Sequence, residues 1–192
     1  MNLILRFLLP VTFLSTPLLA EKPEDEFQAG LREVWVEYEE GDHEAVTAKL
    51  RELIKHIEEK TADQVAEVMP AEIKPWKGES LKREDLTAVG GGFSVSKVYV
   101  DGEKQVEVKV VKDSPLIRPA IEMLNNKDLI ALSQRQTHRI SGETAVMDGD
   151  KKLQMALDGR IYLELVAKGE AKEQDLVTLA RKLDLNALAK VK

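Results

Sequence analysis

The 192-residue sequence contains no cysteine, few aromatic residues and no excess of basic charge. Without cysteine the chain forms no disulfide and offers no thiolate for catalysis or metal binding. The net charge of −6 at pH 7 argues against nucleic-acid binding, because phosphate contacts need clustered lysines and arginines. Apolar residues make up 43% of the sequence and aromatic residues 5%. The chain must therefore be held together by burial of mostly aliphatic side chains.

The sequence contains no G-x-S-x-G or H-E-x-x-H motif and no dinucleotide fingerprint. His43, His56 and His138 have no His or Cys at metal-ligand spacing. The run of three glycines at 90–92 precedes a strand pattern, so we interpret it as a strand entry close to neighbouring backbone. We predict no cofactor and no metal, and favour a non-enzymatic protein. A small hydrolase whose site forms only in three dimensions is the alternative.

The N-terminal 20 residues predict a cleaved signal peptide. Arg6 is the only charged residue before Ala20, and Pro10 and Pro17 interrupt the apolar run. This run is too short for a bilayer span, which needs about 20 apolar residues. We therefore predict a periplasmic or secreted protein, with no membrane span after cleavage. A retained anchor, which would define an anchored structural subunit, and an N-terminal core helix are the alternatives.

Residues 24–69 predict a helical hairpin. The apolar residues of its first half lie three or four positions apart: Phe27, Leu31, Val34, Trp35 and Tyr38. Gly41 is expected to end the first helix and Asp42 to cap the second. Pro70 ends the pattern, which also allows a break near residues 61–63. The two apolar stripes must be buried against each other, the sheet, a second copy or another protein.

Residues 70–80 predict a linker, because two prolines and a glycine lie within them. Two-residue alternation then begins, and tight turns such as Asp101-Gly102 separate the predicted strands. Strands are expected at 93–100, 105–111, 134–140, 144–147, 153–157 and 160–168, and helices at 114–124, 128–132 and 176–183. The predicted fold class is α+β, an N-terminal helical hairpin followed by an antiparallel sheet (81–192) covered by two helices.

The order of the elements over residues 81–190 (strands, helix, strands, helix) resembles the PsbP-type α/β/α sandwich. The whole layout, with a helical pair before such a sheet, resembles uncharacterised exported bacterial proteins. This resemblance implies a fold and no activity.

Residues 134–139 form the least typical predicted strand, because it is polar on both faces. An edge strand or an exposed connection explains this pattern, since unpaired polar groups are costly in a core. The alternative is a binding rim containing Arg135, His138 and Arg139, in which the two arginines reach an anionic group.

Trp76, Tyr99 and Tyr162 are further candidates for ligand or partner contacts, with core packing or cross-strand pairing as the alternative. The sequence as a whole predicts an exported, non-enzymatic binding or accessory protein of the bacterial envelope. Its expected partner is another envelope protein or a small ligand.

Overall fold

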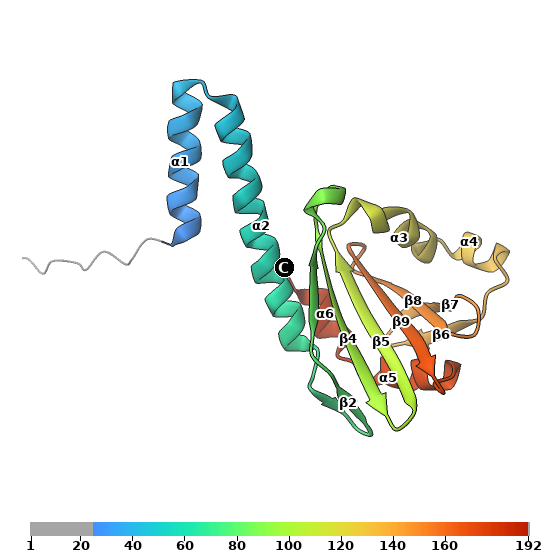
Figure 1. Cartoon of the computed structure of the whole chain (residues 1–192). Helices are drawn as coiled ribbons and strands as arrows, with labels where there is room; N and C mark the ends of the chain where they lie inside the picture. Colours follow the sequence, from blue (N-terminus) through green and yellow to red (C-terminus); the bar gives the residue numbers. More distant parts are fainter. Residues whose placement is uncertain (1–24, 192) are drawn as a thin grey trace, which may run out of the picture.

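Two helices precede a nine-stranded antiparallel sheet, and further helices lie on both faces of that sheet (Figure 1). This α+β arrangement confirms the predicted fold class. A computed structural model describes residues 25–191. The predicted signal peptide lies outside the described residues.

The hairpin consists of α1 (Glu26–Glu40) and α2 (His43–Val68). The Asp25 carboxylate caps α1 by accepting a hydrogen bond from the Phe27 N–H. Gly41 ends α1 at a φ of +79°, a conformation that glycine adopts without strain. The Asp42 carboxylate then accepts from the Ala45 N–H at the start of α2. Both predicted boundary residues, Gly41 and Asp42, are confirmed.

The second helix continues without a break through residues 61–63. The Thr61 side chain stays within the helix, where its hydroxyl donates to the Ile57 carbonyl at 2.8 Å. Val65 is fully buried against the sheet. Tertiary packing therefore stabilises the stretch in which sequence pattern allowed a break.

The sheet has the strand order β1-β2-β4-β5-β9-β8-β7-β6, with β3 also paired to β4. All of the pairings are antiparallel. The strands are β1 (Glu72–Ile73), β2 (Trp76–Gly78), β3 (Lys82–Asp85), β4 (Phe93–Asp101), β5 (Lys104–Lys112), β6 (Thr137–Ile140), β7 (Glu143–Met147), β8 (Lys152–Leu157) and β9 (Ile161–Gly169). The three nine-residue strands β4, β5 and β9 form its centre.

Residues 70–80 differ from the expected linker. They form the short hairpin β1–β2, which extends the sheet by pairing Gly78 with Tyr99 of β4. Pro75 lies in the tight turn between the two strands. Trp76 anchors the hairpin in the core, where it is only 2% exposed.

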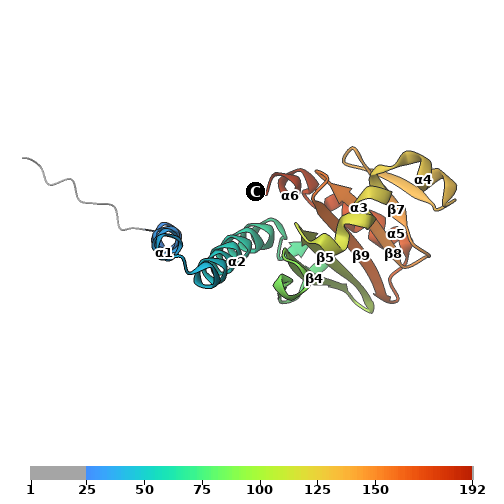
Figure 2. The same cartoon turned by 90° about the horizontal axis from the view of Figure 1, so that it is seen from above.

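Helices cover both faces of the sheet. On one face lie α5 (Glu173–Lys182), α6 (Leu185–Lys190) and the end of α2, over the main hydrophobic core. On the other lie α3 (Arg118–Asn125) and α4 (Lys127–Leu132), over a smaller core (Figure 2). Short 3-10 turns at Thr87–Val89 and Pro115–Ile117 complete the described elements.

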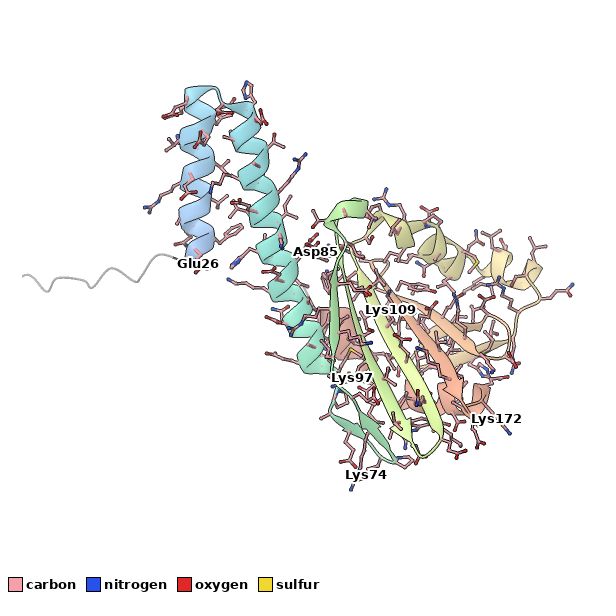
Figure 3. The ribbon with its side chains drawn as sticks, viewed as in Figure 1. Glu26, Lys74, Asp85, Lys97, Lys109 and Lys172 are labelled. Atoms are coloured by element: carbon pink, nitrogen blue, oxygen red, sulfur yellow. The ribbon has the colours of Figure 1, made fainter. Side chains whose placement is uncertain are left out.

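Only the C-terminal part of α2 is anchored to the sheet, and the rest of the hairpin projects from it (Figure 1). The Glu58 carboxylate accepts from the Gly92 N–H at 2.6 Å. Lys97, labelled in Figure 3, donates to the Met69 carbonyl at 3.0 Å, where α2 meets β4. Within residues 25–191, no helix has the length and apolar character required to cross a bilayer.

Candidate functional site

A groove of about 470 Å³ lies between helices α3 and α4 and the edge strand β6 with its neighbour β7. Its apolar wall comes from Leu124, Ile130 and Ala156. Three cationic side chains and one carboxylate also line it: Lys127, Arg135, Arg139 and Glu143. The groove therefore combines an apolar wall with an excess of positive charge, which suits an anionic group attached to an apolar one.

The arginines predicted to form a binding rim lie in this same groove. Arg139 lies on β6 and donates from Nη1 to the Thr144 hydroxyl across the strand pair at 3.2 Å. Arg135 precedes β6, and its Nη2 lies 3.4 Å from an Asp148 carboxylate oxygen. Both members of this ion pair are more than a third exposed, so the pair contributes at most about 1 kcal/mol to stability. A ligand carboxylate or phosphate can therefore compete with Asp148 for Arg135.

His138 is not in the groove, because successive residues of a strand point to opposite faces. Its Nε2 lies 3.0 Å from a carboxylate oxygen of Glu173, at the start of α5. Gln136 donates to the same Glu173 oxygen at 2.6 Å. The structure thus separates His138 from Arg135 and Arg139 and gives it a role in fastening β6 to α5.

Two of the three predicted aromatic contact residues lie in the main core. Trp76 is 2% exposed and Tyr99 is fully buried. The Tyr99 hydroxyl donates to the Pro70 carbonyl at 3.0 Å, and burial raises the pKa of Tyr99 to about 12. Their placement matches the core-packing alternative, since neither ring presents an open face.

Tyr162 of β9 lies in the smaller core and is 9% exposed. Its hydroxyl donates to Glu164 at 2.7 Å and accepts from Gln154 at 2.7 Å. Burial, followed by the hydrogen bond to Glu164, raises the pKa of Tyr162 well above its usual value. The phenol therefore stays protonated at neutral pH and orders neighbouring polar groups on the sheet.

A larger groove of about 970 Å³ adjoins the first and shares Asn125 and Lys127 with it. Its charged lining is balanced, with three basic and three acidic side chains: Arg118, Lys127, Arg160, Asp113, Glu122 and Asp128. Two of these charges already pair, since Arg160 Nη2 lies 2.7 Å from the Asp113 carboxylate. The smaller groove is thus the more selective for an anion.

The hairpin provides a second exposed surface. Besides Val36, six large apolar side chains on it are between 42% and 61% exposed: Leu31, Trp35, Tyr38, Leu50, Ile54 and Ile57. We call these six residues the hairpin face. The Trp35 and Tyr38 rings lie 6.2 Å apart, and the Tyr38 ring lies 6.3 Å from the ring of His43, the first residue of α2. The aromatic part of the hairpin face is therefore near the tip of the hairpin.

No family model, no curated protein and no solved structure matches this chain. The resemblance to a PsbP-type sandwich stays a prediction. Among the described residues, no group of three or more His, Asp or Glu side chains is arranged to hold a metal ion.

The sequence interpretation missed Lys127 and Glu173. Lys127 follows the α4 cap residue Asn126, and only the docking of α4 over β6 and β7 brings it to the arginines. Glu173 opens α5, as acidic residues often do at helix N-termini. No local pattern indicates that either residue faces the 134–140 segment.

Proposed function

We propose that the protein is an exported, non-enzymatic binding or accessory protein of the bacterial envelope. In this proposal, the groove lined by Lys127, Arg135 and Arg139 binds an acidic segment of another envelope protein. The observation that carries the proposal is the convergence of these three cationic side chains in one groove with a single carboxylate. Export is inferred from the N-terminal sequence alone.

The surroundings of the groove favour a protein segment over a lone anion. Leu124, Ile130 and Ala156 form an apolar wall in the groove, next to the cationic side chains. A partner that combines carboxylates with apolar side chains therefore buries apolar area and pairs with the arginines at the same time. Arginine suits this role because its planar guanidinium binds a carboxylate through two parallel hydrogen bonds.

Titration with a synthetic acidic peptide, six glutamates flanked by leucines, tests this proposal by NMR. We expect amide shifts concentrated in residues 124–147 and an affinity that falls at least tenfold in an Arg135→Ala/Arg139→Ala variant. An Arg181→Ala/Lys190→Ala variant is the matched control, since it removes two exposed cations outside the groove. Equal affinity in both double variants contradicts the proposal, as does a shift pattern centred elsewhere.

The same two variants can be compared by affinity capture from an envelope extract. A partner that the parent and the control variant retain, and the Arg135/Arg139 variant loses, supports a protein ligand. If all three forms capture the same proteins, the groove has no role in partner binding.

A further inference from the structure

The six residues of the hairpin face lie on one side of the hairpin. The two helices pack against each other where Gly30 of α1 meets Leu53 of α2. The apolar stripe of α1 lies to one side of this line of contact. The apolar stripe of α2 is rotated away from this line in the same sense, when each helix is viewed from its own N-terminus. Because the two helices are antiparallel, equal rotations bring both stripes to the same side.

The opposite side of the hairpin is polar, which supports this assignment. There the Lys49 ammonium bridges Glu33 at 2.9 Å and Glu52 at 3.3 Å. The hairpin therefore has a charged back and an apolar front.

The size of this front is unusual for a solvent-exposed surface. A whole aromatic side chain has about 150–250 Å² of surface, so Trp35 and Tyr38 alone expose roughly 200–300 Å². The four aliphatic side chains of the hairpin face add to this area. The total reaches the range of the largest apolar patches on monomeric proteins, which are often binding surfaces.

We propose that a second copy of this chain covers the hairpin face from its tip to the level of Ile54, so that two hairpins form an antiparallel four-helix bundle. An apolar front that is two helices wide is half of such a bundle, and an identical front completes it. This inference goes beyond the proposed function and does not depend on the groove.

Charge at the edges of the hairpin face specifies the register. Arg32 and Glu39 lie seven residues apart along the outer edge of α1. In an antiparallel pair of α1 helices related by a two-fold axis, Arg32 of each copy meets Glu39 of the other when the axis passes between Trp35 and Val36. Seven residues correspond to about two helical turns, so both residues lie on the same edge.

The outer edge of α2 specifies the same register independently. Glu44 and Arg51 are also seven residues apart, and they pair reciprocally when the axis passes between Thr47 and Ala48. The position of α1 relative to α2 along the helix axes is given by two contacts. These are the ion pair between Glu33 and Lys49 and the contact between Gly30 and Leu53. The two required axis positions then agree to within about one residue, or ~1.5 Å along the helix. One two-fold axis therefore satisfies four ion pairs.

The overall charge distribution agrees with this arrangement. Residues 25–69 carry 13 acidic and five basic side chains, a net charge of −8. This charge disfavours an anionic lipid surface as the occupant. In the antiparallel register, the acidic tip of one hairpin approaches the arginines of the other copy. The two acidic tips are therefore kept apart. The sheets lie at the two outer ends, because each tip points away from its own sheet (Figure 1).

The oligomeric state of the purified protein, measured by light scattering after gel filtration at 1–100 µM, tests the proposal. We expect a dimer for the parent and a monomer for Trp35→Glu. Val36→Glu is the matched control and should stay dimeric, because Val36 is 51% exposed on the back of α1. Far-UV circular dichroism confirms that the variants fold. A monomeric parent at 100 µM, or equal effects of the two substitutions, overturns the proposal.

Charge reversal and cross-linking test the register. Arg32→Glu should raise the dimer Kd at least tenfold, and Arg32→Glu/Glu39→Arg should restore it. Since the chain has no cysteine, a Thr47→Cys variant should be joined into a covalent dimer by a short bismaleimide, and a Lys60→Cys variant should not. Failure of both the restoration and the Thr47 cross-link overturns this register. Flotation of a monomeric parent with phosphatidylglycerol vesicles would assign the face to lipid and overturn the dimer.

Discussion

Gly92 lies where β4 begins against the end of β5, and its replacement by alanine should be unusually destabilising. Its φ is +83°, a region that alanine adopts only with strain. A Cβ at this position would lie 2.5 Å from the Lys112 carbonyl oxygen and 2.6 Å from the Ser114 nitrogen. These are backbone atoms, so no side-chain rotation relieves the clash. Gly142 offers the matched control, with a φ of +91° and no atom within 4 Å of an added Cβ.

The magnitude follows from two contributions. The positive φ costs about 1–2 kcal/mol in either variant. At Gly92 the forced backbone shift adds about 1–3 kcal/mol, the usual cost of overpacking. The shift also disturbs the 2.6 Å hydrogen bond from the Gly92 N–H to Glu58, which fastens α2 to the sheet. We therefore expect Gly92→Ala to lower the free energy of unfolding by about 2–5 kcal/mol, and Gly142→Ala by about 1–2 kcal/mol.

Urea unfolding followed by far-UV circular dichroism measures this difference by linear extrapolation. A domain with a typical unfolding free energy of about 5–15 kcal/mol remains folded enough for the measurement. If the two alanine variants agree to within about 0.5 kcal/mol, the close backbone approach is not what requires glycine at position 92, and the reasoning is refuted.

Three further predictions concern stability and dynamics. Tyr99→Phe should lower the free energy of unfolding by about 1 kcal/mol, because it removes one buried hydrogen bond; urea titration measures this. Burial opposes ionisation of Asp113, but hydrogen bonds from Lys112 and Arg160 outweigh it and lower the pKa of Asp113 below 3.8. Its ionised form thus stabilises the fold above that pH, and acid titration should show this stabilisation lost as pH falls through the lowered pKa, and absent in Asp113→Asn. Hydrogen exchange of the monomeric Trp35→Glu variant should be faster in α1, which has no buried residue, than in the central strands; equal protection would contradict this.

The sequence predicted the elements whose periodicity and boundary residues are local. Gly41 and Asp42 define the hairpin turn in the structure as expected. The glycine run at 90–92 is confirmed at Gly92 as a close approach between backbones. In each case, the prediction rested on the backbone conformation or hydrogen bonding that one residue type favours, and packing against distant residues did not change it.

Elements that depend on distant partners were not predictable in this way. Residues 70–80 have the composition of a linker, and only pairing with β4 and burial of Trp76 make them strands. The lining of the groove could not be predicted for the same reason. Alternation along β6 implies that His138 and Arg139 face opposite sides, but the layer above each side depends on where α4 and α5 dock. Lys127 therefore joins the arginines through topology alone.

The two proposed interfaces lie at opposite ends of the molecule and differ in charge. Residues 25–69 carry a net charge of −8, whereas residues 70–192 carry 21 basic and 19 acidic side chains, a net charge of +2. Pairing of hairpins leaves both α4 grooves uncovered, because the groove lies on the side of the sheet domain remote from the hairpin (Figure 1). A dimer would then carry two uncovered grooves, one on each sheet domain. Two weak acidic-segment sites linked in this way would bind a repetitive partner far more tightly than one site, because the second contact is intramolecular. The hairpin would thus strengthen binding at the groove without touching the ligand.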